Sequence, residues 1–561
     1  MNMNDHSKEE YESDLKARLD ILRTKLNDGK INIAPHLIEG FKSSLANIQY
    51  SENGDIILDT VDGRIRSMAL MISHFEERDK LKKQFSLNEI QNTYFQIVEN
   101  SFKPIFEKMT KEKVNAHQVA SFYSSNDALI RNIAPQINRF INNIYDFWRN
   151  VGDIGCWHLE DSLDNLNGVY GGDLFPSYNE NIASKCGIYT DTLVLPDPFV
   201  RSKYVFETSE DSTRVYYFVK HGLNVLKYKE LACTDLIYPI VAILPDMQNL
   251  EDNGRDIIRV LGQADTLIHA QKIFDANFDD EEELADFFKS LDTIEKLENN
   301  IRRKDRVLFD TDWNCSFKDN FRRYKDTLPK NILGNITPGE IFHSHIFSRM
   351  AISNELLLKS RQLAGVPIIE APTSWQYFNW KLEYDALRAE NHYSVDGLHI
   401  LKGLNDLSHT DMPWIGNIPS ESLIELRKQD ALHEIRDILG DSIHELIETN
   451  PSNFNITRDK LLKNIDNSLS MHRKKIDDLR QRKWRFAGHD IGSWIVMGGI
   501  EIAAALTGTP SWGLGLIAAN QVLDPPKLKE IPEIYREISA ESEAIKKSPV
   551  GLLFKASNNN L

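Results

Sequence analysis

Apolar residues recur every three or four positions through the first quarter of the chain, and this spacing predicts helices. One such stripe consists of Leu15, Leu19, Leu22 and Leu26. A second amphipathic segment covers 128–151, with apolar positions at Ile130, Ile133, Ile137, Phe140, Ile141, Ile144 and Phe147. We therefore expect residues 1–151 to form a helical N-terminal domain.

A different pattern follows, in which two apolar runs each end in Leu-Pro-Asp. The run over 189–195 leads to Asp197, and the run over 236–244 leads to Asp246. A stretch with helical spacing separates the two runs, which is the order of a βαβ unit with parallel strands. A small sheet is therefore expected, within a mixed α/β central domain that covers 152–375.

The last part of the chain, 376–561, again has helical spacing, but it contains an unusual apolar segment over 491–523 in which Glu501 is the one charged residue. A Gly-Thr-Pro sequence divides this segment into two arms, so it predicts a glycine-rich helical hairpin. The arms hold about 17 and about 12 apolar residues, whereas a helix that spans a bilayer needs about 20.

Basic and aromatic residues precede and enter this hairpin. They are Arg480, Arg482, Lys483, Trp484 and Arg485 before it, and Trp494 and Trp512 within it. Basic residues and tryptophans beside an apolar segment are typical of a surface that contacts an anionic membrane or a partner protein. The alternative is a hairpin that is buried in a soluble helical domain.

Length, charge and cysteine usage narrow the class of protein. The 561 residues carry 66 Lys and Arg against 83 Asp and Glu, a net charge of −17, which does not favour nucleic acid as a partner. The four cysteines are widely separated and the N-terminus has no apolar leader, so a cytoplasmic protein, peripheral to the inner membrane if the hairpin binds lipid, is expected. The fold predicted overall is mainly α-helical, of the α+β class.

Three carboxylates stand where apolar runs end. Asp197 and Asp246 follow the two runs described above, and Glu370 follows a third short run over 366–369. Functional groups of parallel sheets gather at the carboxyl ends of strands, so these residues are candidate catalytic groups. Together they could hold Mg²⁺ or Mn²⁺, the cofactor of a metal-dependent phosphodiesterase or nuclease. The alternative is that each acidic residue only caps the turn after its strand.

Two short segments resemble large uncharacterised bacterial proteins that often accompany antiphage systems. They are Asp191–Phe199 and Met412–Pro419, the second followed by Arg427 and Arg436. The resemblance implies a defence or toxin-like component that associates with a partner protein or with copies of itself, with conditional membrane contact by the hairpin. The hydrolase is one alternative, and a helical scaffold or sensor protein is another.

Overall fold

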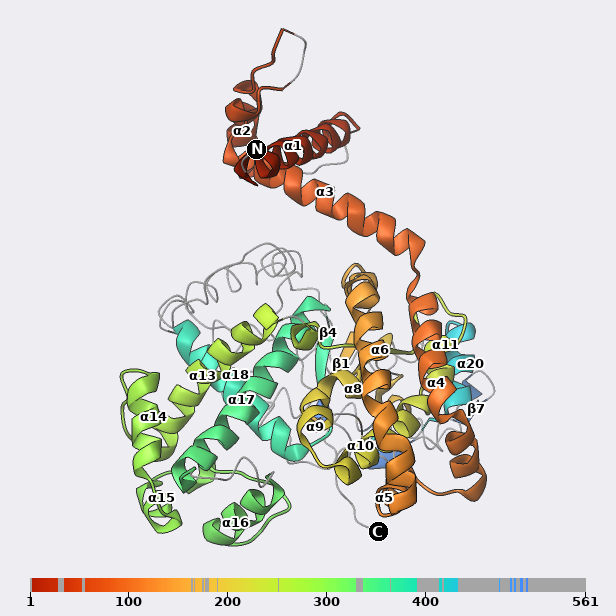
Figure 1. The fold of residues 1–561 in the computed structure, drawn as a ribbon, viewed down its shortest axis with the longest axis vertical. Helices are drawn as coiled ribbons and strands as arrows, with labels where there is room; N and C mark the ends of the chain where they lie inside the picture. Colours follow the sequence, from red (N-terminus) through yellow and green to blue (C-terminus); the bar gives the residue numbers. More distant parts are fainter. Residues whose placement is uncertain are drawn as a thin grey trace. The chain divides into compact units, whose positions relative to one another are not determined.

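The computed structural model describes residues 3–28, 35–52, 56–162, 165, 167–173, 176, 181–188, 190–250, 252–328, 336–363, 365–390, 413–415, 418–431, 474, 485–486, 489–490, 495–497 and 501–502. The protein is mainly α-helical with a small parallel sheet, which confirms the predicted fold class (Figure 1). The chain divides into two compact units, Met1–Leu87 and Asn88–Leu561.

The first unit is a small helical body with its own core. It contains α1 (Met3–Asn27), α2 (Pro35–Ala46), a short 3-10 helix (Leu58–Thr60) and α3 (Gly63–Gln84). The predicted leucine stripe is buried at Leu15, Leu19 and Leu22, which pack with Phe41, Val61, Ile65 and Ala69. Asp62 begins α3 because its side chain accepts the backbone N–H of Ile65.

The second unit is built on a five-stranded sheet with the order β3-β2-β1-β4-β9. The strands are β1 (Asn167–Gly171), β2 (Thr192–Pro196), β3 (Val241–Leu244), β4 (Gly365–Ile369) and β9 (Glu501–Ile502). The first four are mutually parallel, and β9 pairs antiparallel with β4. The βαβ unit predicted from the two Leu-Pro-Asp runs is thus confirmed as β2 and β3.

The central strand β1 was not predicted, because its sequence Asn-Gly-Val-Tyr-Gly has no apolar run. Its two glycines are required by packing. A Cβ atom at Gly168 would lie 2.5 Å from Cδ1 of Ile368, and one at Gly171 would lie 2.5 Å from Cδ1 of Leu356. The sequence of β1 is therefore explained by the close approach of neighbouring side chains, and not by residues with a high strand propensity.

One group of helices lies beside the sheet (Figure 1). It contains α4 (Leu87–Glu112), α5 (Ala116–Ser124), α6 (Asp127–Glu160), α7 (Ile182–Cys186), α8 (Pro198–Arg201), α9 (Lys203–Thr208), α10 (Asp211–Leu226), α11 (Lys229–Cys233) and α12 (Met247–Leu250). The predicted amphipathic face of α6 is buried at Ile137, Phe140, Ile141 and Ile144. This helix continues through the predicted domain boundary between 151 and 152.

The outer edge of the sheet is closed by a side chain. β3 pairs with β2 on one side, and on the other side Gln91 of α4 contacts the backbone of Ile243. The Gln91 Nε2 donates to the Ile243 carbonyl at 2.9 Å, and the Ile243 N–H donates to Gln91 Oε1 at 2.9 Å. A fully buried glutamine thus makes the two hydrogen bonds that another strand would make.

Between β3 and β4 the chain forms a helical lobe. It contains α13 (Asp252–Phe274), α14 (Glu281–Ser290), α15 (Ile294–Asn300), a 3-10 helix (Lys304–Arg306), α16 (Phe317–Thr327) and α17 (Pro338–Gln362), and α18 (Pro372–Glu390) joins it after β4 (Figure 1). α17 contacts β1 and β4 as well as α13 and α18. It begins with a capping box between Thr337 and Glu340.

The C-terminal region differs from its prediction where the structure describes it. β5 (Pro413–Ile415) pairs with β8 (Ile495–Met497), β6 (Arg485–Phe486) pairs with β7 (His489–Asp490), and α20 is Ser420–Lys428. The predicted helical arm is therefore wrong at β8 and β9, which are strands. Short apolar runs rich in isoleucine and valine suit either structure, and here partner strands decide. The rest of 491–523 lies outside the described residues.

Candidate functional site

The carboxyl ends of the parallel strands meet at one edge of the sheet, where ligand sites of α/β proteins are found. β1 ends at Gly171, β2 leads to Asp197, β3 leads to Asp246 and β4 leads to Glu370. Along the chain the sheet grows outward from β1 to β2 and β3, and then it continues on the other side with β4. The strand order therefore reverses between β1 and β4. In open α/β sheets, ligands bind at the carboxyl ends of the two strands that flank such a reversal.

Asp197 has a structural role at this edge. Its Oδ1 accepts the backbone N–H of Phe199 at 2.7 Å and of Val200 at 3.2 Å, which caps α8. Its Oδ2 accepts the indole N–H of Trp148 at 2.5 Å. Burial raises the pKa of the Asp197 carboxyl to about 6, although these donors oppose the shift. Capping was the alternative to catalysis at Asp197, and the contacts of Asp197 are those of a cap.

Asp246 is held by two buried cations. Arg201 Nε lies 3.0 Å from its Oδ2, and Lys359 Nζ lies 2.6 Å from its Oδ1. Burial alone would raise the pKa of this carboxyl, but the charges of Arg201 and Lys359 outweigh burial and hold the pKa at about 2. Asp246 is therefore ionised at neutral pH and is bound within the protein.

Glu355 of α17 shares the same arginine. Its Oε1 lies 3.2 Å from Arg201 Nη2. Burial raises the pKa of Glu355 to about 7, and the negative charge of Asp246 adds to this shift against the attraction of Arg201. We call Arg201, Asp246, Glu355 and Lys359 the edge network. It contains a carboxyl group that gains or loses a proton near neutral pH.

Glu370 stands apart from these groups. Its Oε1 lies 3.1 Å from Lys185 Nζ, and the Tyr170 hydroxyl donates to its Oε2 at 3.4 Å. Among the described residues no group of three or more His, Cys, Asp and Glu side chains could hold a metal ion. The three carboxylates therefore lie along one edge without forming a set of metal ligands there, and their catalytic roles stay a prediction.

The turn after β1 joins two arginines to the sheet. Gly172 has a φ of +81°, a conformation that glycine adopts readily. Its carbonyl accepts the Ser374 hydroxyl at 2.6 Å, and Arg349 Nη1 donates to that Ser374 Oγ at 3.3 Å. The carbonyl of the next residue, Asp173, accepts Arg201 Nη1 at 2.5 Å. We call these five residues the glycine corner.

Arg349, in the glycine corner, and Trp375, next to Ser374 in the sequence, both carry N–H donors that bear on this corner. Arg349 is half-buried, with its Cζ 6.0 Å from the centre of the Tyr377 ring, and it has no carboxylate partner among the described residues. The indole N–H of Trp375, in the first turn of α18, is buried and has no hydrogen-bond acceptor among the described residues. Because arginine presents five donors and the described residues give Arg349 one hydrogen-bond acceptor, Ser374 Oγ, the corner retains donors for a further acceptor.

Sequence reasoning found the strand-end carboxylates but missed their cationic partners. Arg201 ends the short helix that begins within Leu-Pro-Asp-Pro, and this position was a usable signal. Lys359 and Arg349 come from α17, which lies far along the chain from Asp197 and Asp246. No local spacing in the sequence predicts that they return to this edge of the sheet. The predicted contact residues Arg480, Arg482, Lys483, Trp484, Trp494 and Trp512 lie outside the described residues, and Arg485 is described only as part of the backbone of β6.

Comparisons with protein-family models, with curated proteins and with solved structures find no match to this chain. The resemblance to defence-associated proteins therefore stays a prediction. Among the helices in the described ranges, none is both long enough and apolar enough to cross a bilayer. Membrane contact by the apolar segment likewise stays a prediction.

Proposed function

We propose that the protein binds a small anionic molecule, of the phosphate-bearing kind, at the glycine corner. The observation that carries the proposal is Arg349, a guanidinium without a carboxylate partner among the described residues, attached through Ser374 to the first carbonyl after β1. This position is the point where the strand order reverses. Ligands of open α/β sheets bind in that position.

The chemistry of the corner suits a doubly charged oxyanion. Arg201 donates to the Asp173 carbonyl, and Arg349 is linked to the neighbouring Gly172 carbonyl through the Ser374 hydroxyl, so two arginines are connected to one turn. Guanidinium matches phosphate and carboxylate geometry through paired N–H donors. α18 begins at Pro372, directly after β4, and the positive end of its dipole adds to the attraction for an anion. The site favours an anion over a neutral ligand.

A binding site of this kind accords with the sensor that the sequence analysis offered as an alternative. The predicted defence component needs a trigger, and a small anionic molecule can serve as one. The association with a partner protein or with copies of the chain belongs to the same proposal. In that version, ligand binding at the corner precedes association.

Calorimetric titration of the purified full chain tests the proposal. The probes are sodium sulfate, pyrophosphate and a panel of nucleoside mono-, di- and triphosphates. Arg349→Gln keeps hydrogen-bonding capacity but removes the charge, and the expected result is affinity at least tenfold lower, the loss of about one charge-assisted contact.

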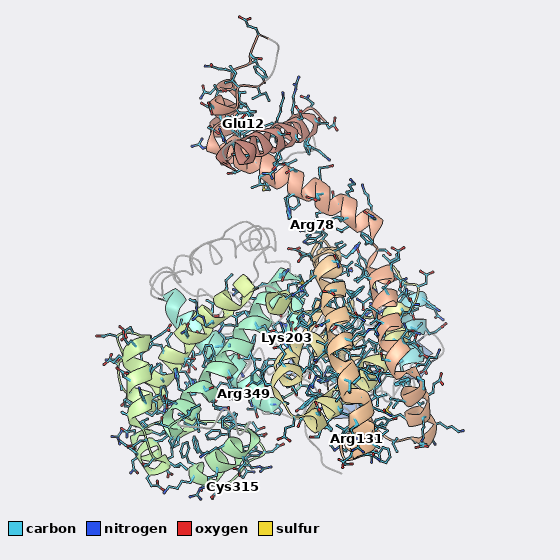
Figure 2. The ribbon with its side chains drawn as sticks, in the orientation of Figure 1. Glu12, Arg78, Arg131, Lys203, Cys315 and Arg349 are labelled. Carbon is cyan, nitrogen blue, oxygen red and sulfur yellow. The ribbon has the colours of Figure 1, made fainter. Side chains whose placement is uncertain are left out.

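Arg131→Gln is the matched control, because Arg131 is an exposed arginine on α6, a different helix from that of Arg349 (Figure 2). It should bind the probes as the unmodified protein does. Equal affinities for the unmodified protein and Arg349→Gln would overturn the proposal. So would the absence of measurable binding by every probe at millimolar concentration.

A further inference from the structure

Arg201 is the residue that the edge network and the glycine corner share. Three of its five N–H donors have partners in the described structure: Nε lies beside Asp246, Nη1 donates to the Asp173 carbonyl and Nη2 donates to Glu355. An anion that binds two N–H donors of Arg201 as a pair therefore competes with one of these partners. The identity of that partner decides how binding depends on pH.

Glu355 is the partner that can be replaced with least cost. Its side chain is 15% exposed, whereas that of Asp246 is 1% exposed and also bound to Lys359. Asp173 contributes a backbone carbonyl, which the fold of the turn fixes in position. Glu355 also comes from α17, the helix that carries Arg349, so it lies on an element of the proposed site.

We propose that the ligand displaces the Glu355 carboxylate from Arg201 Nη2, and that Glu355 takes up a proton when this happens. The inference rests on the proposed function and assigns the regulation of the same site. One hydrogen bond from Arg201 to Glu355 is exchanged for one to the anion. The carboxylate that loses its cation then holds a proton from solvent, so each anion enters with about one proton above neutral pH.

The charged groups around Glu355 support this exchange. Arg201 of α8 favours its ionised form, while Asp246 after β3 opposes it, and burial opposes it further. Lys359, on the same helix as Glu355, is engaged with Asp246. Because Glu355 has a pKa of about 7 with Arg201 beside it, losing that contact leaves burial and Asp246 to raise the pKa higher.

Sulfate is the probe for this test, because it keeps its double charge throughout the pH range used. The unmodified chain should bind sulfate about tenfold more weakly at about pH 8 than at about pH 6, with uptake of about one proton near pH 8. The uptake is measured by titration in buffers of different ionisation enthalpy. In Glu355→Gln the affinity should be the same across this range, at or above the pH 6 value of the unmodified chain.

Glu207→Gln, on exposed Glu207 of α9, is the matched control and should keep the pH dependence of the unmodified chain. Asp197→Asn tests the other carboxyl with a pKa near this range, about 6, and should keep it as well. A pH dependence that survives in Glu355→Gln, or one that is absent from the unmodified chain, would overturn the inference. Loss of sulfate binding in Arg349→Gln would still support the proposed function in that case.

Discussion

Two neighbouring residues of α17 enter two different buried charge networks. Glu355 belongs to the edge network, at the carboxyl end of the sheet. Asn354 faces the helical lobe, where its Nδ2 donates to Asp265 at 2.6 Å. Lys381 of α18 lies 3.2 Å from the same Asp265 Oδ2 and 2.5 Å from Asp385. We call Asp265, Asn354, Lys381 and Asp385 the sealed network.

The two networks differ in how their cations are used. The side chains of Lys381 and Asp265 are both 0% exposed, and one lysine serves two carboxylates. In the edge network two cations serve two carboxylates, and one of these carboxylates is partly exposed. The described cation of the sealed network is fully buried, whereas the edge network contains one partly exposed carboxylate, Glu355, the partner that we propose is exchanged.

The largest effect is expected from Lys381→Met in the sealed network. This change removes the cation that Asp265 and Asp385 share and leaves two carboxylates buried around an apolar side chain. The free energy of unfolding should fall by about 3–5 kcal/mol. Chemical denaturation followed by circular dichroism measures it, with Lys325→Met on the exposed surface of α16 as the control. A loss no larger than that of the control would remove the distinction between the networks.

A smaller effect is expected from Lys359→Met in the edge network. Asp246 keeps its contact with Arg201, so no carboxylate is left without a cation. The free energy of unfolding should fall by about 1.5–3 kcal/mol, the usual range for one hydrogen bond to a charged group. The same denaturation experiment compares this variant with Lys381→Met. If Lys359→Met proved the more damaging of the two, the ranking of the networks would be reversed.

The smallest effect is expected from the titration of Glu355. Its pKa is raised from 4.5 to about 7, so its contribution to stability is fully present below about pH 4.5 and is lost as pH rises through about 7. Glu355→Gln should reduce this decline in the free energy of unfolding by about 1 kcal/mol between about pH 6 and about pH 8. Asp197, with a pKa of about 6, changes stability in the same direction and accounts for a decline that persists in the variant. Identical profiles for the two proteins would contradict the assignment.

The sequence was sufficient for those parts of the fold that local pattern determines. The amphipathic face of α6, the capping box of α17 and the strands β2, β3 and β4 are encoded by spacing and by apolar runs. β1 is not encoded in this way, because its glycines are set by side chains from α17 and β4 that come some 200 residues later. β8 and β9 were predicted as helix because a short apolar run fits both structures, and the run itself does not show which strand it pairs with.

The same limit applies to the candidate site. The acidic residues at the strand ends were located correctly, since the rule that places them there is local. Whether acidic residues meet a metal ion or a cation of the protein depends on which helices return to that edge. Arg201 and Lys359 return there, and Lys185 reaches Glu370 in the same way. No spacing within a single segment contains that information.

Gln91 has a consequence for how this protein can be shortened. Because a side chain of α4 makes both backbone hydrogen bonds of Ile243, this part of the β3 edge is already occupied in the described structure and is closed to a strand of another chain. A fragment that began at residue 152, the boundary suggested by sequence pattern, would contain all the parallel strands and yet leave one of them uncovered. Fragments intended for crystallisation or expression should therefore begin before α4, so that self-association through β3 is prevented.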